Sequence, residues 1–214
     1  MKQAHFQIAK LTFGKNGPYD LSCGPECIGI KGVSGIGKTL FLRALCDLDP
    51  HGGEVILNGR KLSEFTGPQW RSQVGMVPAE SRWWHSRIRD HFPIQMERDQ
   101  IVEMVNTLGF KPEVLNWQPS RLSTGEKQRL SLARTLAREP AVLLLDEMGS
   151  GLDSANLQTV EQIVLEYQKL KQVTVIWVSH DDDQLHRVCD RSFTLLVDKL
   201  IPVEETSSLQ NKGQ

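Results

Sequence analysis

The residues from Gly32 to Thr39 read Gly-Val-Ser-Gly-Ile-Gly-Lys-Thr and match the phosphate-binding pattern G-x-x-x-x-G-K-[ST] at every fixed position. Glycines let successive backbone N–H groups turn toward phosphate oxygens, a lysine reaches the β- and γ-phosphates, and a threonine hydroxyl ligates Mg²⁺. The segment therefore predicts a nucleoside-triphosphate site. The residues expected to contact the nucleotide are Gly32, Val33, Ser34, Gly35, Ile36, Gly37, Lys38 and Thr39.

Two carboxylates follow an apolar run later in the chain. Residues 141–145 read Ala-Val-Leu-Leu-Leu, which is typical of a buried strand, and Asp146 and Glu147 come directly after it. Parallel sheets place their ligands at this carboxyl edge. Asp146 can hold Mg²⁺ directly or through water, and Glu147 can orient or deprotonate the water that attacks the γ-phosphate. Two acids at a strand end can also be idle, but the upstream phosphate-binding pattern favours catalysis.

The elements on either side of the glycine-rich segment agree with this interpretation. Residues 27–30 form a short apolar run that predicts a strand, and apolar residues at helical spacing follow the loop. A strand, a loop and a helix in this order point the helix N-terminus at the bound anion. The helical apolar residues are Leu40, Phe41, Ala44, Leu45 and Leu48.

The remaining patterns predict strands toward both ends of the chain and helices between them. Residues 81–134 are helical in character, which predicts a lobe inserted into the core. The order of strand, helix and strand after this lobe predicts a parallel sheet. The expected strands are residues 6–13, 27–30, 54–57, 73–77, 141–145 and 173–178, the expected long helix is 154–171, and the expected turns are Gly52-Gly53 and Asn58-Gly59.

Length and composition are those of one large globular domain. The chain has 214 residues and a formal net charge of −1, which gives no electrostatic reason to expect nucleic acid as a partner. It has no signal-peptide pattern and no apolar run of about eighteen residues, so we expect a cytosolic chain. Cys23, Cys27, Cys46 and Cys189 are too scattered for a zinc framework and are expected to be reduced. The polar residues 204–214 predict a flexible tail.

A third motif spans residues 122–129, which read Leu-Ser-Thr-Gly-Glu-Lys-Gln-Arg. It resembles the LSGGQ signature of ABC ATPases, which separates that family from other phosphate-loop proteins. A helix that begins here offers a hydroxyl, free backbone N–H groups and a positive dipole end, all of which suit an anion. Ser123 followed by Glu126 is also a helix capping box. Both interpretations hold together.

The resemblance to ABC ATPases covers nearly the whole chain. Residues 150–153 are similar to the D-loop and residues 178–181 to the segment with the switch histidine, and both follow the earlier motifs in the family order. The resemblance implies an α/β fold of the P-loop NTPase class, with a RecA-like parallel sheet core, an N-terminal antiparallel β part and a helical subdomain inserted at about residues 81–134. It also implies that residues 1–214 form a single ABC-type ATP-binding domain with ATP and Mg²⁺ as its ligands.

In ABC proteins the ATP lies between the phosphate loop of one subunit and the signature of another. The resemblance therefore implies a homodimer, in which Ser123 and Gly125 contact the γ-phosphate held by the partner. It also implies that His180 contacts the γ-phosphate in its own subunit. The acids at 181–183 suggest metal ligands at first sight, but their place at the start of a helical segment favours an acidic N-terminal cap.

The chain departs from the family pattern at several positions. Ala79 stands where the Q-loop has its Mg²⁺-contacting glutamine, and Glu80 one residue later is the candidate replacement. A glutamate would bring a full negative charge to the metal, either directly or through water. We therefore expect Thr39 and Asp146, with Glu80, on the metal side of the site. Thr124 and Gly151 are small changes in the signature and the D-loop that should leave the backbone contacts intact.

The family also places an aromatic ring against adenine, upstream of the phosphate loop. Phe13 is the expected stacking residue, with Tyr19 as the alternative, and a role in the core is equally compatible with either residue.

Residues 82–85 read Arg-Trp-Trp-His and follow the Q-loop-like segment directly. In ABC transporters this region helps form the groove that receives a helix of the membrane subunit. Two adjacent tryptophans are not easily buried on one strand face, so at least one is expected to be exposed, and exposed aromatics beside basic residues suit an interface. The alternative is that both rings pack between the helical lobe and the core.

These observations predict an ATP-hydrolysing subunit that powers a separately encoded transmembrane permease and lies on the cytoplasmic face of the inner membrane through that partner. Several segments resemble small bacterial ATPases of iron export, so metal export is one candidate process, but no residue of this chain would touch the cargo, and the sequence leaves the substrate and the direction of transport open. The alternative is a soluble ABC ATPase with a mechanical or regulatory role. Such proteins usually carry two cassettes, a long coiled coil or basic nucleic-acid patches, and these features are not visible in the sequence.

Overall fold

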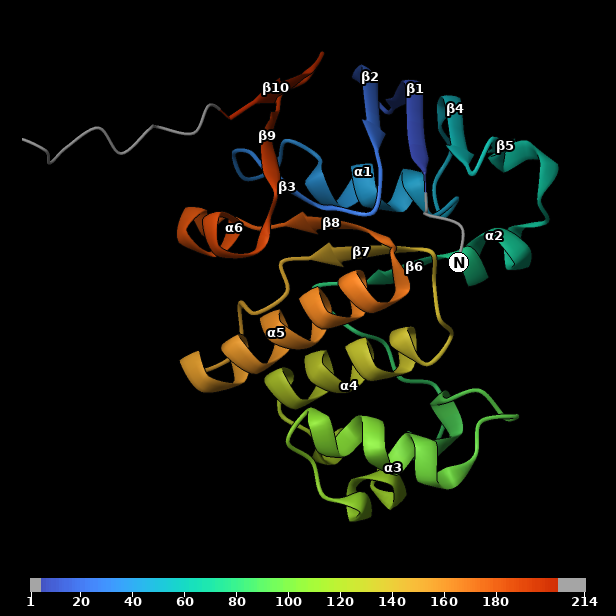
Figure 1. The fold of residues 1–214 in the computed structure, drawn as a ribbon, viewed down its shortest axis with the longest axis vertical. Coiled ribbons are helices and arrows are strands. Elements are labelled where there is room, and N and C mark those ends of the chain that lie inside the picture. Colours follow the sequence, from blue (N-terminus) through green and yellow to red (C-terminus); the bar gives the residue numbers. More distant parts are fainter. Residues whose placement is uncertain (1–4, 204–214) are drawn as a thin grey trace, which may run out of the picture.

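The computed structural model describes residues 5–203, and its core is a six-stranded sheet (Figure 1). From β9 to β6 all neighbouring strands run parallel, and only β10 pairs with its neighbour in the antiparallel sense. In spatial order the strands are β10 (Leu200–Pro202), β9 (Arg191–Leu195), β3 (Cys27–Lys31), β8 (Thr174–Val178), β7 (Val142–Asp146) and β6 (Val74–Val77). All residues of β7 and β8 are buried, as expected for strands covered on both faces.

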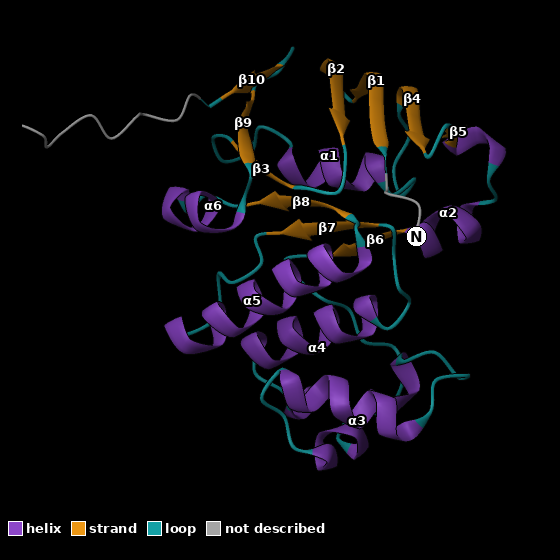
Figure 2. Cartoon of the chain, viewed as in Figure 1, coloured by secondary structure: helices purple, strands orange, loops and turns teal. Residues whose placement is uncertain are grey.

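A second sheet of antiparallel strands lies above helix α1 (Lys38–Leu45) (Figure 2). Its spatial order is β2 (Asn16–Cys23), β1 (Phe6–Phe13), β4 (Gly52–Leu57) and β5 (Arg60–Lys61). Apolar side chains from this sheet, α1 and one face of the parallel sheet share a single buried cluster. Helix α1 is therefore sandwiched between the two sheets, and this position holds the start of the helix in place.

The opposite face of the parallel sheet is covered by helices. Helices α4 (Thr124–Leu136) and α5 (Ser154–Lys171) lie against it, and α3 (Arg98–Thr107) lies further out (Figure 1). A second apolar cluster joins these helices to β7 and β8. The remaining elements are the helices α2 (Gly67–Gln73) and α6 (Asp182–Val188) and the short 3₁₀ turns Leu62–Glu64, Ile88–His91, Pro112–Asn116 and Pro119–Arg121.

The predicted fold class is confirmed: a parallel core, an N-terminal antiparallel sheet and helices inserted between β6 and β7 are all present. The first part of the predicted helical region differs, because residues 78–87 contain no helix. Strand β1 and helix α5 have the predicted bounds. Strands β2, β5, β9 and β10 were missed.

The predicted turn at Gly52-Gly53 is wrong, because both residues belong to β4. Gly53 has a positive φ of 78°, and a side chain there would collide with the carbonyl of Lys10 on the neighbouring strand β1. Close approach of two backbones therefore requires glycine here, and not the reversal of the chain that a glycine pair usually indicates. The turn at Asn58-Gly59 is present, with both residues at positive φ.

The residues predicted to form a flexible tail, 204–214, lie outside the described part of the chain. Within residues 5–203, no helix is both long enough and apolar enough to cross a membrane.

Candidate functional site

The glycine-rich loop joins β3 to α1 at the carboxyl edge of the parallel sheet. Gly35 and Gly37 have positive φ values of 77° and 105°, which turn the backbone as a phosphate-binding loop requires. Gly37 also has no room for a side chain, since a Cβ atom there would lie 3.2 Å from the ring of Phe13. From the β1–β2 hairpin, the Asn16 amide donates to the carbonyl of Ile36 at 2.6 Å. The β1–β2 hairpin therefore supports the phosphate loop through this hydrogen bond.

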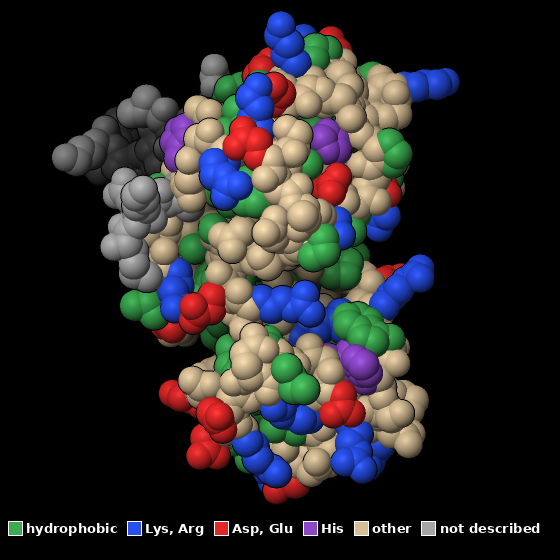
Figure 3. All heavy atoms as spheres, turned by 90° about the vertical axis from the view of Figure 1, so that its right-hand side faces the viewer, with side chains coloured by type: hydrophobic (Ala, Val, Ile, Leu, Met, Phe, Trp, Pro, Cys, Tyr) green, Lys and Arg blue, Asp and Glu red, His purple; other side chains and the backbone are tan. Residues whose placement is uncertain are grey.

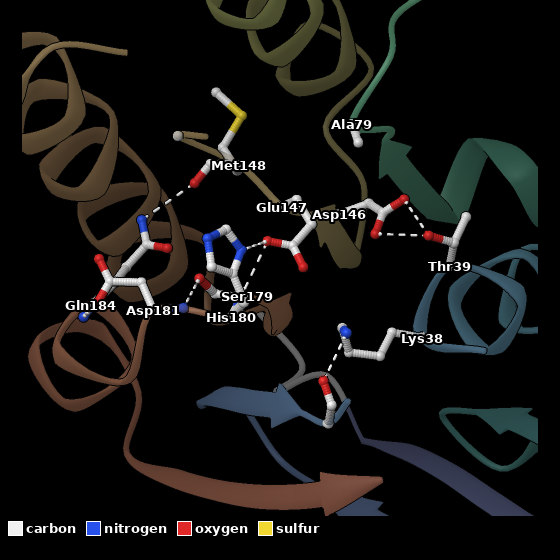
Figure 4. A network of polar contacts seen from close by, with 12 residues as sticks. Lys38, Thr39, Ala79, Asp146, Glu147, Met148, Ser179, His180, Asp181 and Gln184 are labelled. Carbon is white, nitrogen blue, oxygen red and sulfur yellow. Dashed lines mark hydrogen bonds and ion pairs between the residues drawn. The ribbon is translucent and has the colours of Figure 1, made fainter. Parts of the chain in front are cut away.

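Lys38 and Thr39 stand at the start of α1 and face the end of β7 (Figure 4). The Lys38 ammonium donates to the carbonyl of Gly32 at 2.8 Å and so reaches back across its own loop. The Thr39 hydroxyl lies 2.9 and 3.1 Å from the two carboxylate oxygens of Asp146. Burial raises the pKa of the Asp146 carboxyl above its ordinary value, and the hydrogen bond from Thr39 opposes this. Neighbouring hydroxyl and carboxylate oxygens are a donor set that suits Mg²⁺.

Glu147 and His180 are paired directly. A His180 ring nitrogen, Nδ1, lies 2.6 Å from Oε2 of Glu147 (Figure 4). A carboxylate only accepts, so Nδ1 carries a hydrogen and donates it to Glu147. Strand register explains the encounter: Asp146 lies opposite Val178, and the next residues of β7 and β8 leave the sheet at the same edge. The His180 side chain is 70% exposed, so it can meet a ligand from solvent.

The backbone at Glu147 is held in an uncommon conformation. Its φ is +50°, which a residue with a Cβ adopts only when its surroundings impose it. The Glu147 N–H donates to Val178 at 2.9 Å, and the Gln128 amide donates to the Glu147 carbonyl at 3.3 Å. Gln184 donates to the carbonyl of Met148 at 3.1 Å. Hydrogen bonds from two buried glutamines therefore fix the backbone at Glu147 and at Met148, the residue that follows it.

Sequence reasoning missed these two glutamines. Gln128 is 2% exposed and Gln184 is 3% exposed, although glutamine is usually a surface residue. Gln128 shares one face of α4 with Leu132 and Leu136, at spacings of four residues. An amide inside an apolar helical row is the signal that could have identified it, because a buried polar side chain needs hydrogen-bond partners.

The signature segment begins α4 as expected from its capping box. Ser123 is the N-cap, its hydroxyl accepts from the Glu126 N–H at 3.3 Å, and its own N–H donates to the Glu126 carboxylate at 2.8 Å. Gly125 packs on the D-loop-like segment, where a side chain would lie 2.8 Å from the Gly151 carbonyl. Ser123 is exposed, and within residues 5–203 no hydrogen bond joins residues 122–129 to residues 32–39. The signature is therefore not brought to the phosphate loop of its own chain.

The adenine-stacking role predicted for Phe13 does not agree with its position. Phe13 is only 5% exposed and stacks on Tyr19, with ring centroids 5.7 Å apart. Tyr19, the alternative, is fully buried and donates to the carbonyl of Leu196 at 2.6 Å. Both rings fill the core between the antiparallel sheet and α1, so neither presents a free face to a base. Phe13 instead packs behind the phosphate loop.

The Q-loop-like segment follows β6. The carbonyl of Ala79 lies 3.5 Å from the Gln128 amide, and Glu80 is exposed. In the described chain no hydrogen bond joins Glu80 to Thr39 or Asp146. The role of Glu80 at the metal remains a prediction.

Of the two neighbouring tryptophans, one is packed against the core and the other is exposed. Trp83 packs against the helical core and donates to the Ser81 hydroxyl at 3.0 Å, whereas Trp84 is 62% exposed. Their loop is organised by His91, whose Nε2 accepts from the backbone N–H groups of Trp84 and His85, both at 3.0 Å. The His91 Nδ1 then donates to the Arg87 carbonyl, also at 3.0 Å. These contacts require a neutral imidazole.

Stability should therefore depend on pH through His91. Burial lowers the pKa of His91, and the positive charges of Arg134 and His85 act in the same direction, against the backbone carbonyl of Arg87. The unfolded chain takes up a proton as pH falls through about 6.5, while folded His91 stays neutral until lower pH. We expect the Tm of the wild type to fall more steeply between about pH 7 and 5 than that of His91→Gln, which keeps an acceptor but does not titrate. Equal slopes of Tm against pH in the wild type and in His91→Gln would contradict this expectation. The same reduction of the slope in the exposed control His5→Gln would contradict it as well.

The acids at 181–183 form a helix cap, as expected. The Asp181 carboxylate accepts from the Gln184 N–H at 3.1 Å, and Asp182 and Asp183 lie in the first turn of α6. Across residues 5–203, no group of three or more His, Cys, Asp and Glu side chains is arranged to hold a metal ion.

A glycine-rich loop between a central strand and a helix, with Asp146 and Glu147 at the end of β7, defines a P-loop nucleoside triphosphatase. Residues 19–150 match the family model of the ABC transporter, and the chain belongs to this family. It is an ATPase domain of that family.

Relatives of known name agree with this assignment. The chain is 29% identical over 194 residues to YjkB of Bacillus subtilis, whose name describes an ATP-binding protein of an ABC transporter, with 87% of this chain and 77% of YjkB covered. It is 32% identical over 206 residues to the methionine import ATP-binding protein MetN of Xanthomonas euvesicatoria, with 88% of this chain and 61% of MetN covered. The chain thus spans less than two thirds of MetN.

Two solved structures share the fold. Part of the chain of a bacterial Atm1-family ABC exporter with ATP bound superposes with a TM-score of 0.83 at 21% identity, covering 93% of this chain and 38% of the exporter chain. CbiO1 from Clostridium perfringens, part of the complex CbiONQ, superposes with a TM-score of 0.77 at 19% identity, covering 94% of this chain and 88% of CbiO1. At these identities the likeness concerns the fold alone.

Proposed function

We propose that this chain is the ATP-hydrolysing subunit of an ABC transporter and that it drives a separate membrane permease. The observation that carries the proposal is the pair Glu147–His180, joined at 2.6 Å directly beside the pair Thr39–Asp146. An acid held by an imidazole next to a phosphate loop is suited to activating water for attack on a γ-phosphate. The family membership supports the coupling to transport.

Each residue of the loop and of the acid pair has a role in this proposal. Backbone N–H groups of residues 32–37 would surround the phosphates. When the nucleotide binds, the Lys38 ammonium would leave the Gly32 carbonyl and donate to phosphate oxygens instead. Thr39 and Asp146 would hold Mg²⁺, which when bound neutralises charge on the phosphates. Glu147 would accept the proton of the attacking water. The Glu147–His180 bond orients the imidazole, whose other ring nitrogen, Nε2, would contact the γ-phosphate in the same subunit.

The position of the signature supports a homodimer. Ser123 is exposed at the N-terminus of the 13-residue helix α4, where the helix dipole and free N–H groups favour an anion. Its own chain brings no phosphate loop to it. We propose that this end of α4, with Ser123 and Gly125, contacts the γ-phosphate bound by a second copy, so that two ATP molecules are enclosed between two chains.

The homodimer is tested by two substitutions that keep the helix cap. Aspartate and asparagine both cap helices as well as serine does, so Ser123→Asp and Ser123→Asn should fold alike. Only Ser123→Asp places a negative charge against the incoming phosphate. We expect ATP-dependent dimerisation, measured by light scattering after size-exclusion chromatography, to be lost in Ser123→Asp and kept in Ser123→Asn. ATP-dependent dimers of equal strength in both variants would exclude this interface.

The permease would bring the chain to the cytoplasmic face of the membrane. The exposed ring of Trp84, next to the Q-loop-like segment, is the proposed contact, while the packing of Trp83 holds its loop in place. The cargo stays a prediction: iron export was suggested by sequence resemblance, whereas MetN is named for methionine import. Transport assays with a co-expressed permease, comparing iron and methionine, test this part.

A further inference from the structure

A positively charged cleft lies between α2, β6 and the C-terminal half of α4. Its volume is about 150 Å³, and its lining includes three arginines, Arg71, Arg134 and Arg138, but no aspartate or glutamate. The exposed ring of Trp84 is part of its wall. On the face drawn in Figure 3, Lys and Arg side chains gather in the hollow between the two halves of the molecule, beside hydrophobic and histidine side chains.

The positive charges of Arg134 and Arg138 are not compensated by an acidic side chain of the described chain. Arg134 donates to the carbonyl of Arg82 at 2.7 Å and its guanidinium lies 4.4 Å from the Trp83 ring and 5.1 Å from the Trp84 ring, so its neighbours are a carbonyl and two aromatic faces. Neither Arg134 nor Arg138 takes part in an ion pair within residues 5–203. Glu139, the acid next to Arg138, pairs with Lys171 at 2.9 Å.

This arrangement costs free energy in the isolated chain. Burial lowers the pKa of Arg134 to about 10, and the like charge of Arg138 acts in the same direction. Arg71 donates to the Asp47 carbonyl at 3.1 Å and lies 3.5 Å from the Asp47 carboxylate. The position of Arg134 is explained by its contact with the tryptophan loop, because guanidinium groups stack on aromatic rings. This contact does not explain Arg138, which lines the same cleft and has no ion pair within residues 5–203.

A bound anion would relieve this repulsion. Guanidinium groups bind carboxylates through two parallel hydrogen bonds, and clustered arginines are used where such a group must be recognised. The volume is that of a single small side chain and is well below the several hundred Å³ of a typical site for a nucleotide-sized ligand. An aromatic ring at the edge offers an apolar contact beside the charge, as in interface hot spots.

We propose that this cleft binds the carboxylate of an aspartate or glutamate in a docking segment of the permease, with an apolar side chain next to that acid packed on Trp84. The proposal rests on the proposed transport function. It adds the chemistry of the partner: a membrane subunit that fits this chain carries an acidic residue beside an apolar one in its cytoplasmic segment.

The test uses a library of random 12-residue peptides displayed on phage and selected against the folded full chain. We expect enriched peptides to share an acid beside an aromatic or aliphatic residue. A synthetic enriched peptide should lose about 10-fold or more in affinity when its acid becomes the amide. Arg138→Gln should cause a similar loss for the acidic peptide and little further loss for its amide version, which is the signature of a direct pair.

Two further variants separate this result from a folding defect. Arg138 is exposed and its side chain makes no hydrogen bond in the described chain, so Arg138→Gln should leave the fold and basal ATP hydrolysis unchanged. Arg98→Gln, at an exposed position of α3, is the matched control and should bind peptide like the wild type. Trp84→Ala should weaken binding of both the acidic and the amide peptide.

Several results would overturn the proposal. Selection of peptides without acids, or of none, would mean that the cleft does not recognise a carboxylate on a protein. If inorganic phosphate or anionic phospholipid vesicles displace the peptide as well as a second peptide does, the cleft binds a free anion or a lipid headgroup instead. Basal ATP hydrolysis is measured on the same samples. If the peptides do not bind as expected while the wild type still hydrolyses ATP, the proposal for the cleft is wrong and the proposed function stands. An inactive wild type counts against the proposed function.

Discussion

Glu147→Gln is expected to reduce ATP turnover by about 10³-fold while ATP still binds. Glutamine has nearly the same size as glutamate, and it can still accept the hydrogen bond from His180 that now spans 2.6 Å. It cannot accept a proton from water at neutral pH. The phosphate loop and Asp146 are unchanged, so the nucleotide affinity should stay close to that of the wild type. Single-turnover hydrolysis and equilibrium binding of labelled ATP measure the two quantities separately.

A charge-matched control makes this result specific. Glu103 is exposed on α3, away from the site, and Glu103→Gln removes the same charge from the chain. Turnover in that variant should equal the wild-type rate. If Glu147→Gln also turns over normally, Glu147 is not the acid that activates water, and the positive φ of 50° at this residue serves another purpose.

Lys38→Met should weaken ATP binding by about 100-fold. A charge-assisted hydrogen bond contributes roughly 1.5–3 kcal/mol, and about 2.8 kcal/mol corresponds to a factor of 100 in the dissociation constant. Methionine keeps the length and the apolar stem of lysine but offers no donor to phosphate. The bond from Lys38 to the Gly32 carbonyl is lost as well, so the empty loop should become more mobile. Titration calorimetry with ATP measures the affinity.

Lys31→Met provides the comparison for this second substitution. Lys31 ends β3 immediately before the loop and pairs with Asp182 at 2.9 Å, but it is not part of the phosphate-binding pattern. Its loss should change ATP affinity only slightly. Equal losses in both variants would mean that overall positive charge near the loop, and not the ammonium of Lys38, holds the nucleotide.

Motifs with a fixed spacing could be read directly from the sequence. Residues 32–39 leave few alternatives, because glycine at positive φ followed by lysine and threonine has a local backbone cause, and the observed φ values at Gly35 and Gly37 agree with it. The cap at Ser123 is equally local, since its partner Glu126 is three residues away. Strands β7 and β8 were found because burial on both faces leaves an uninterrupted apolar run.

Errors occurred where a residue has two compatible environments. Phe13 suits a base-stacking site and a core equally well, and the packing of β1 on α1 decided for the core. Strand β2 was missed because it starts with Asn-Gly-Pro, which is typical of a turn, although its later residues pair with β1. Trp83 and Trp84 look alike in the sequence, and only the helical lobe determines which of the two rings is covered.

By itself, the sequence determined the chemistry of this protein: a phosphate loop, an acid pair and a signature whose local geometry follows from neighbouring residues. Only the tertiary structure decided which groups meet. Thr39 reaches Asp146 across 107 residues, Glu147 reaches His180 across 33, and Arg71 of α2 lies on the same cleft as Arg134 and Arg138, beside Trp84. The physical reason is that such contacts depend on strand order and helix packing, which arise from the burial of the whole chain and leave no local pattern at the residues they bring together.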